Sequence, residues 1–332
     1  GMSIHCLLAT ATAAPPSHGY RTDYEYSQIT RSYYKIHVES HNIHAAKEIC
    51  ALEGAEVMAP VPKENLKQAH KMMKKFPDLG NYLWILNDGD KEQHQVAEDP
   101  QMECTLEALK NSYECEVMTR RGEIELLGCN QKIPFICMVE EKNAPYDSQC
   151  GVYGRGYTYI ASVGSCYKIP NMPMKWDGAY DECQAEGAHM LVLNSAAESA
   201  AVKINVLDHA PRLRFAQTTY FFHAGIRANE PTDGSQRVFR TIFSEYWFAQ
   251  ECGRIAPREG VANLVPTAQG FPRLNYETLE EAGFSTWSEG EPNNAAGLEQ
   301  CGTVFSNNGL YNDVECNHLY GFVCEKEVHL TQ

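Results

Sequence analysis

The chain has 332 residues, a length that favours two domains over one. Hydrophobic residues make up 43% and charged residues 21%, so a packed core is expected and disorder of the whole chain is not. The formal net charge of −15 argues against nucleic acid, and against an anionic membrane surface as the primary partner, because both attract basic proteins. An acidic surface does suit a protein that holds a divalent cation.

The 13 cysteines indicate either a disulfide framework or metal–thiolate sites. The sequence contains no Cys-x-x-Cys pair, and the spacings are long and irregular. Disulfides formed in an oxidising compartment are therefore favoured. The odd total leaves at least one thiol without a partner in the chain.

The N-terminus contains a short apolar stretch around Leu7 and Leu8, followed by Ala11-Thr12-Ala13. This small-residue pattern is like a signal-peptidase site, although no basic segment precedes it. We interpret residues 1–29 as a signal remnant and N-terminal extension. The signal remnant reaches to about Ala14; a disordered terminus is the alternative, and both exclude this part from the fold. No apolar run approaches the ~20 residues that a membrane helix needs.

An internal repeat sets the expected architecture. The segment 50–55, Cys-Ala-Leu-Glu-Gly-Ala, recurs at 183–188 as Cys-Gln-Ala-Glu-Gly-Ala. Each copy ends a helix-like segment, and in the second copy the apolar residues follow helical spacing from Trp176 to Cys183. Ser195-Ala196-Ala197-Glu198 then predicts a capping box that opens a second helix.

The repeat continues through buried strands expected at 82–86 and 220–226. Each copy closes on an aromatic-aliphatic-Cys end, at 135–137 and 322–324. The polar segment 141–149, which contains a proline, is the expected linker.

The repeat also sorts the cysteines, although sequence alone does not prove connectivity. One bridge in each copy joins the first helix to the last strand, one is a short inner bridge, and the second copy has an additional N-terminal bridge. The expected pairs are Cys50–Cys137, Cys115–Cys129, Cys150–Cys166, Cys183–Cys324 and Cys301–Cys316. Three cysteines remain unpaired in this scheme: Cys6, Cys104 and Cys252.

A helix that carries a Cys, a second helix, an inner Cys pair and a terminal Cys resemble the C-type lectin-like domain. Two such domains in tandem are similar to the dual-domain immulectin-type lectins of insect haemolymph. The resemblance implies an α+β fold in which each domain has two helices, antiparallel sheets and a long loop region, stapled by disulfides. The expected domains span 30–140 and 150–327, followed by a tail at 328–332.

The strongest local signal is a group of carboxylate and amide side chains near the C-terminus, in a segment rich in Gly, Asn and Pro. Ca²⁺ takes about 6–8 oxygen ligands, whereas zinc prefers the nitrogen and sulfur donors that this segment does not require. The three carboxylates and two amides are Glu291, Asn293, Glu299, Asn312 and Asp313.

The resemblance makes these five residues the principal calcium site, and it implies a cis bond before Pro292 that turns Glu291 and Asn293 toward a common point. Ca²⁺ with coordination room accepts two adjacent sugar hydroxyls. Each hydroxyl donates to the carboxylate of Glu291 or Glu299 and accepts from the amide of Asn293 or Asn312. In the family, the order Glu-Pro-Asn resembles sites for mannose-type sugars, and Gln-Pro-Asp goes with galactose.

Three departures from the family pattern are present. Tyr311 stands in place of the usual Trp, and one extra residue between Cys301 and Asn312 is expected to shift the last two ligands. Asn294 and Gln300 replace carboxylates that some members use for an auxiliary calcium. We therefore expect no strong second Ca²⁺ site beside the first.

The first domain lacks the pattern. No Glu-Pro-Asn or Gln-Pro-Asp precedes Cys115, and Glu-Leu-Leu-Gly at 125–128 stands before Cys129 where Asn-Asp is needed. The segment 87–90, Asn-Asp-Gly-Asp, is oxygen-rich, but such clusters are usually turns. We expect no calcium-mediated sugar binding there; a spacer, a protein-contact surface and a second weak site remain open.

The segment 227–275 is longer than the family needs and contains several arginines. A disordered insertion is favoured over an extended loop that contacts ligand or partner. Cys252 is free in this interpretation to join Cys104 or another chain.

Catalysis is not expected. Glu291 and Glu299 resemble a glycosidase pair only in type, because a catalytic acid needs a raised pKa and a carboxylate on Ca²⁺ stays ionised. Gly154-Arg155-Gly156 lacks the helix that a phosphate-binding loop requires.

The resemblance implies a secreted pattern-recognition lectin of innate immunity, in a haemolymph-like fluid, that binds mannose-type glycans of microbial polysaccharide or lipopolysaccharide. Single sugar sites are weak, so useful binding requires several sites and self-association is a hypothesis. The rival interpretation is a lectin-like module that binds protein or lipid without calcium or sugar.

Overall fold

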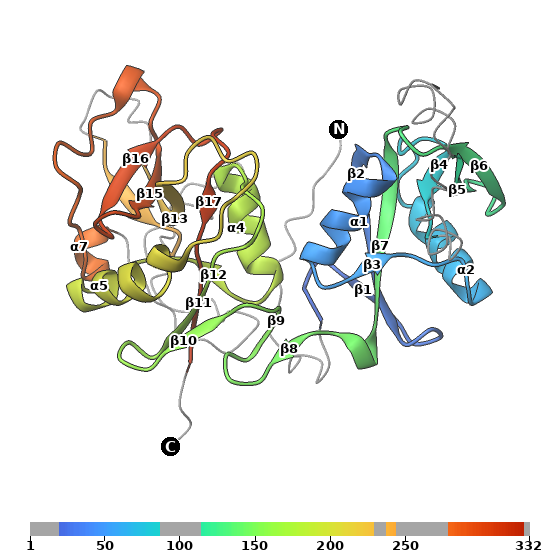
Figure 1. The fold of residues 1–332 in the computed structure, drawn as a ribbon, viewed down its shortest axis with the longest axis horizontal. Helices are drawn as coiled ribbons and strands as arrows, with labels where there is room; N and C mark the ends of the chain where they lie inside the picture. Colours follow the sequence, from blue (N-terminus) through green and yellow to red (C-terminus); the bar gives the residue numbers. More distant parts are fainter. Residues whose placement is uncertain (1–19, 87–113, 229–236, 244–277, 329–332) are drawn as a thin grey trace, which may run out of the picture. The chain divides into compact units, whose positions relative to one another are not determined.

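The computed structural model describes residues 20–86, 114–228, 237–243 and 278–328. The chain divides into a first unit, Thr22–Tyr146, and a second unit, Asp147–Gln332 together with Gly1–Arg21. Each unit has its own helices, sheets and hydrophobic core (Figure 1). Cys6, Cys104 and Cys252 lie outside the described residues.

In the described part of the first unit, seven strands form one sheet in the order β1-β2-β7-β4-β5-β6, and β3 also pairs with β7. The helices α1 and α2 follow β2 and β3 along the chain. The elements are β1 (Glu25–Ser27), β2 (Ser32–His41), α1 (Ile43–Leu52), β3 (Glu56–Val57), α2 (Lys63–Met73), β4 (Tyr82–Trp84), β5 (Glu114–Thr119), β6 (Ile124–Gly128), β7 (Ile133–Glu140) and η2 (Glu141–Asn143).

In the described part of the second unit, one sheet has the order β10-β11-β18-β12, and a second has the order β14-β13-β15-β16 with β17 on β13. The elements are β9 (Val152–Tyr153), β10 (Thr158–Ile160), β11 (Ser165–Lys168), α4 (Trp176–Ala185), β12 (His189–Met190), α5 (Ala196–Asn205), η3 (Leu207–His209), β13 (Phe221–Ala228), β14 (Phe239–Thr241), α7 (Leu279–Ala282), η4 (Ala295–Gly297), β15 (Cys301–Phe305), β16 (Tyr311–Val314), β17 (Gly321–Phe322) and β18 (Cys324–Glu327).

The structure adds detail to three expected segments at the edges of the domains. The extension 1–29 is not wholly outside the fold, because Tyr20 and Arg21 are buried and the Arg21 guanidinium donates to both carboxylate oxygens of Glu182 at 2.8 Å. The linker 141–149 contains η2 and part of the β8–β9 pair. Aromatic and ion-pair contacts order these segments, although their polar composition predicts loops.

The linker strand β8 (Tyr146–Asp147) is followed by a turn in which the Asp147 carboxylate accepts the main-chain N–H groups of Gln149 and Cys150. This is the local hydrogen bonding that Asp commonly makes in turns. The insertion expected at 227–275 is also partly regular, because its first two residues complete β13 and its residues 239–241 form β14. Residues 229–236 and 244–275 of it lie outside the described residues.

The two units share the framework that the repeat predicts. In each, a disulfide joins the first helix to the last strand: Cys50–Cys137 from α1 to β7, and Cys183–Cys324 from α4 to β18. Cys115–Cys129, Cys150–Cys166 and Cys301–Cys316 are also present, so the structure contains all five expected pairs.

The repeated Glu of the Cys-x-x-Glu-Gly segment holds the helix against the first long strand. Glu53 is the C-cap of α1, and its carboxylate binds Lys35 of β2 at 2.5 Å and accepts the Tyr24 hydroxyl at 2.5 Å. Glu186 caps α4 and binds Lys168 of β11 in the same way. Both glutamates are buried, and a buried carboxylate is stable only when it is paired.

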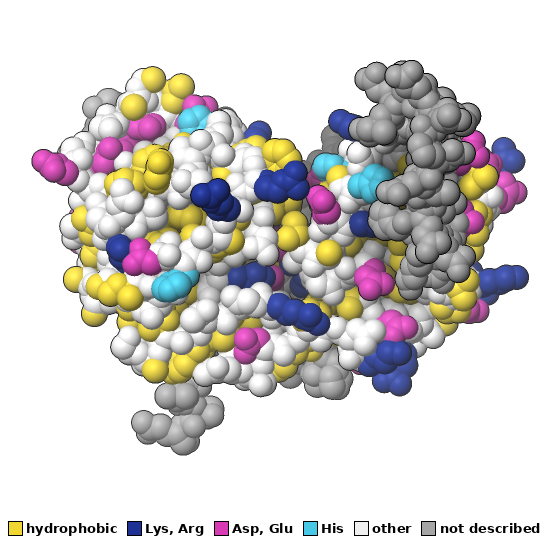
Figure 2. All heavy atoms as spheres, viewed as in Figure 1, with side chains coloured by type: hydrophobic (Ala, Val, Ile, Leu, Met, Phe, Trp, Pro, Cys, Tyr) yellow, Lys and Arg dark blue, Asp and Glu magenta, His cyan; other side chains and the backbone are white. Residues whose placement is uncertain are grey.

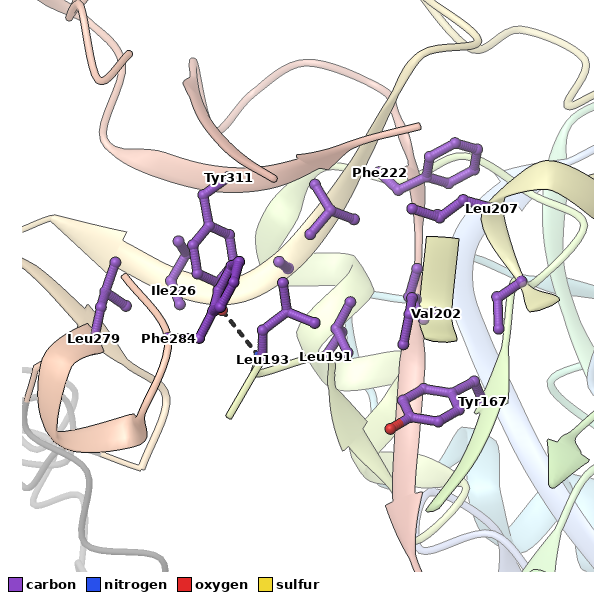
Figure 3. Close-up of a cluster of buried hydrophobic side chains, with 14 of the residues drawn as sticks. Tyr167, Leu191, Leu193, Val202, Leu207, Phe222, Ile226, Leu279, Phe284 and Tyr311 are labelled. Atoms are coloured by element: carbon purple, nitrogen blue, oxygen red, sulfur yellow. Dashed lines mark hydrogen bonds between the residues drawn. The ribbon is translucent and has the colours of Figure 1, made fainter. Parts of the chain in front are cut away.

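The core of the second unit packs α5 against the strands β11 and β13 (Figure 3). Leu191 and Leu193 follow β12 and lie between Val202 of α5 and Tyr311 of β16. The main-chain N–H of Leu193 donates to the Tyr311 hydroxyl at 2.9 Å. This bond connects the core to the strand that carries two of the expected metal ligands.

The capping box expected at 195–198 forms only in part. The Ser195 hydroxyl accepts the N–H of Glu198 as predicted, and α5 begins at Ala196. The Glu198 carboxylate instead accepts the N–H of Asn194 at 2.6 Å and the Tyr167 hydroxyl at 2.5 Å. Tertiary contacts therefore replace the local reciprocal bond.

The Glu198 carboxylate shares this buried space with a second one, that of Glu325 in β18. The Glu325 side chain accepts the N–H of Val192 and also contacts the Tyr167 hydroxyl at 3.3 Å. Burial, followed by the charge of Glu198, raises the pKa of Glu325 well above its usual value. The neutral form is thus favoured in the folded protein.

We predict that Glu325→Gln does not destabilise the protein at pH 7 and stabilises it at higher pH. A carboxyl whose pKa is raised on folding contributes stability below its unfolded pKa and loses it as pH rises through the folded pKa, and Gln cannot ionise. Urea unfolding at several pH values between 5 and 9 measures the change. A larger loss of stability for the variant at pH 9 than at pH 5 would contradict the assignment.

The neighbouring Glu327 supplies a control with the opposite sign. Burial alone would raise its pKa, but the hydrogen bond and charge of His189 and the charge of Lys326 lower it to about 2. The stability it contributes is present above its unfolded pKa and lost as pH falls toward about 2. Glu327→Gln is therefore expected to cost about 1–2 kcal/mol at pH 7.

Candidate functional site

The loop before β15 carries Glu291, Asn293 and Glu299. The N–H of Glu291 donates to the carbonyl of Ser288 at 3.0 Å, and the Glu291–Pro292 peptide bond is cis. After Asn293 the backbone enters the left-handed region at Asn294 (φ 49°), which reverses the chain before η4. The Glu291 and Asn293 side chains consequently face each other, with the Asn293 amide donating to the Glu291 carboxylate at 3.0 Å.

Strand β16 carries the other two expected ligands. Asn312 and Asp313 are paired in register with Thr303 and Gly302 of β15, and Cys301–Cys316 closes this pair of strands. The residues between Cys301 and Asn312 form the rest of β15 and the turn at 306–310 that leads into β16. The substituted aromatic, Tyr311, is fully buried and lies 5.6 Å from Phe284, ring centroid to ring centroid.

The Asp313 carboxylate is the centre of the site. Its Oδ1 accepts the main-chain N–H of Asn293 at 3.0 Å, and its Oδ2 accepts that of Asn294 at 2.9 Å. The side chain is completely buried. Asp313 thereby fixes the loop of Glu291 and Asn293 to strand β16.

The main-chain N–H of Asn293 donates to both Glu291 Oε2 at 3.1 Å and Asp313 Oδ1 at 3.0 Å, so the two carboxyl groups are neighbours. Burial, and then the hydrogen bond and charge of Asp313, raise the pKa of Glu291. Burial alone would raise the pKa of Asp313, but hydrogen bonds from Arg237 and Asn294 and the bond with Glu291 lower it. Two neighbouring carboxyl groups repel each other when both are ionised, so they need either a shared proton or a cation between them.

Glu299 and Asn312 are the remaining two expected ligands. The Glu299 carboxylate accepts the N–H of Ala295 at 2.6 Å, and burial, partly offset by this bond, raises its pKa. Asn312 is buried, and its amide donates to the main-chain carbonyl of Asp313 at 2.7 Å.

The carboxylate and amide oxygens of the site fit a metal ion in part. In the described part of the chain, the carboxylates of Glu291, Glu299 and Asp313 do not all lie within 4.8 Å of one another. One His-Glu-Cys group, His37, Glu53 and Cys137, is that close, but Cys137 is in a disulfide and cannot be a ligand. The Glu291–Asp313 pair and the neighbouring amides fit a hard cation with oxygen ligands, and Glu299 would complete the set after a small movement.

Arg237 contributes a side chain to the site, although the sequence did not indicate it as a site residue. Its Nη2 donates to Asp313 Oδ2 at 2.7 Å, and its Nη1 donates to the main-chain carbonyl of Glu299. The only sequence signal was the presence of arginines in the segment 227–275.

The first unit contains no comparable loop among its described residues. The segment 125–128 lies in β6 and pairs with β5 as a regular antiparallel strand, with Cys115–Cys129 across the pair. Residues 87–90, the oxygen-rich segment, lie outside the described residues. By their register with the strand that carries the first inner cysteine, Glu125 and Leu126 of β6 stand where Asn312 and Asp313 stand in the second unit, so the Asp position has no side-chain oxygen.

Comparisons with known proteins identify the class of the chain. The family model for the lectin C-type domain matches residues 39–139, which lie in the first unit. Perlucin from Haliotis laevigata is 31% identical over 133 residues, which are 39% of this chain and 74% of that protein. The chain therefore belongs to the C-type lectin domain family.

Two further relatives match a longer part of the chain. A hemolymph lipopolysaccharide-binding protein from Periplaneta americana is 30% identical over 174 residues, 52% of this chain and 53% of that protein. A hepatic lectin from Gallus gallus is 25% identical over 177 residues, 53% of this chain and 61% of that protein. The matches thus span little more than half the length of these two relatives.

Among solved structures, the carbohydrate-recognition domain of the mouse scavenger receptor C-type lectin aligns with a TM-score of 0.33 and 16% identity. The alignment covers 52% of this chain and 96% of that chain.

We predict that Tyr311→Phe lowers the free energy of unfolding of the second unit by about 1–3 kcal/mol, because it leaves the buried N–H of Leu193 without its acceptor. Chemical denaturation followed by circular dichroism measures the loss. Tyr220→Phe, at a half-exposed tyrosine of the same unit, is the control and should change stability by under about 0.5 kcal/mol. Equal effects of the two substitutions would contradict the role of Tyr311.

Proposed function

We propose that the chain is a tandem C-type lectin whose second unit binds mannose-type glycans through Ca²⁺, and that it recognises microbial surface polysaccharide or lipopolysaccharide. The observation that carries the proposal is the convergence of Glu291 and Asp313 from two segments, with the Asn293 amide beside them. The cockroach relative is named for binding lipopolysaccharide, which is consistent with the microbial partner proposed for this chain.

The tandem arrangement is part of the proposal, because the family model covers the first unit alone. The second unit supports it through the same helix-to-last-strand disulfide and the same capped glutamate as the first. In both units a strand that follows the second helix is central in its sheet: β4 in the first and β13 in the second.

The chemistry of sugar recognition follows from the side chains. Ca²⁺, when bound, supplies the Lewis acid that two adjacent hydroxyl oxygens coordinate. The carboxylates of Glu291 and Glu299 would accept hydrogen bonds from the sugar hydroxyls, and the amides of Asn293 and Asn312 would donate hydrogen bonds to the hydroxyl oxygens. Glu291 and Asn293 are at the surface, where a sugar has access, whereas Asn312 is buried and must release its bond to Asp313 to take part.

The proposal also covers where the protein is located and what it binds. The disulfides favour an extracellular protein, and the proposed role is binding rather than catalysis. Among the described residues, no helix is long and apolar enough to cross a membrane. On the face of the second unit shown in Figure 2, acidic and basic side chains are interspersed, so the described residues there offer no broad basic surface to a polyanion. Because one sugar site binds weakly, self-association is proposed to supply avidity.

Calcium-independent recognition of protein or lipid is the second candidate. The observation that favours it is the ion pair of Arg237 with Asp313, which satisfies this carboxylate without a metal. Elution from immobilised mannan separates the two: release by mannose and by EDTA supports the lectin, and release by neither supports the second candidate.

We predict that the purified full-length chain binds mannose-type glycans on an array in Ca²⁺ but not in EDTA, and that Asn293→Asp reduces this binding at least tenfold. Asp replaces an amide donor with a second acceptor, so one hydroxyl loses its partner, a loss of about 1.4 kcal/mol or more.

The control is Asn205→Asp, which makes the same change at the exposed end of α5 in the same unit. It should leave the array signal unchanged. Mannose-type signals that persist in EDTA, or that survive Asn293→Asp at full strength, would refute the proposed function.

A further inference from the structure

Arg237 links the two segments that build the site. It lies two residues before β14, and its guanidinium contacts both Asp313 of β16 and the main-chain carbonyl of Glu299 in the loop. A single side chain thus bridges the loop and the strand. A metal ion bound to these ligands would make the same connection.

The surroundings hold the guanidinium in this place. Its Cζ lies 5.1 Å from the ring centroid of Phe239, and that ring packs edge-on against Trp287 at a centroid distance of 4.7 Å. The side chains of Arg237 and Asp313 are 17% and 0% exposed. An ion pair that is screened from water and has cation–π support is stronger than one on the surface.

The ion pair occupies one of the two carboxylate oxygens that Asp313 offers to a metal. Asp313 Oδ2 already accepts the N–H of Asn294 and that of Arg237 Nη2, and Oδ1 accepts the N–H of Asn293. A carboxylate oxygen has about two lone-pair directions for strong acceptance. A cation that binds Asp313 at Oδ2 must therefore displace the guanidinium, which also carries a charge that repels it.

We propose that Arg237 is a built-in cation of this site, which orders the loop 291–299 in the absence of metal and competes with Ca²⁺ for Asp313. Arg237 then sets the calcium concentration above which the site becomes competent for sugar. The inference rests on the proposed function for its calcium step, and it adds a residue from the segment 227–275 to the control of that site.

Titration calorimetry with CaCl₂ on the full chain tests the competition. Arg237→Met removes the charge and keeps an apolar stem over Phe239, and we expect it to lower the Kd for Ca²⁺ at least about tenfold. Arg237→Lys keeps the charge but loses the two-pronged contact, and we expect a smaller change. Arg214→Met is the control, because Arg214 also lies over an aromatic ring, that of Phe215, in the second unit; its Kd should equal that of the natural chain.

Amide hydrogen exchange in EDTA tests the ordering role without any sugar. Arg237→Met should speed exchange at Asn293 and Asn294, whose N–H groups donate to Asp313, and CaCl₂ should restore protection. Unchanged exchange in the core strand β13 shows that the variant remains folded.

The outcomes separate this inference from the proposed function. Tighter Ca²⁺ binding by Arg237→Met than by the natural chain supports the inference. Ca²⁺ binding by the variant alone also supports it, but that result overturns the calcium dependence of the natural chain. A natural chain that binds Ca²⁺ as tightly as the Met variant overturns the inference alone. If neither protein binds Ca²⁺, both the inference and the proposed function are overturned.

Discussion

The buried carboxylate of Asp313 is the contact on which the site depends. It accepts two main-chain N–H groups from the loop of Asn293 and Asn294 and pairs with a guanidinium, and the Glu291 carboxylate accepts one of the same N–H groups. Charge repulsion between neighbouring carboxylates would otherwise open this loop, because two such groups cannot both ionise at close range without a cation. The loop conformation and the cation are therefore coupled, whichever cation is present.

The two units use one framework with different loops. In both, a buried glutamate at the end of the first helix binds a lysine of the first long strand, and a disulfide joins that helix to the last strand. The framework supports a regular β5–β6 pair in the first unit and an oxygen-rich loop with β16 in the second. Stability thus resides in the shared elements, and the proposed binding site lies in the segment between the inner cysteines of the second unit and the one before it.

The repeat made much of the fold predictable from sequence, because cysteine spacing and helical periodicity are local signals: the positions of α4 and β13 and the five disulfide pairs follow from it. The candidate ligands were also visible, since they form a contiguous motif. Arg237 was not, because an isolated arginine in an aperiodic segment gives no sign of which carboxylate it will reach. Tyr20, Arg21 and the Glu198 carboxylate were misjudged for the same reason: their partners, such as Glu182 and Tyr167, are distant in sequence.

The central claim is that the oxygens around Asp313 form a calcium site in competition with Arg237. Crystal structures of the full chain grown with CaCl₂ and with EDTA test it most directly. The account predicts, in the calcium crystals alone, an ion at about 2.3–2.6 Å from carboxylate oxygens of Glu291 and Asp313, with the Arg237 guanidinium withdrawn from Oδ2. An Asp313–Arg237 ion pair that is intact in both crystals, with no ion beside it, would contradict the account.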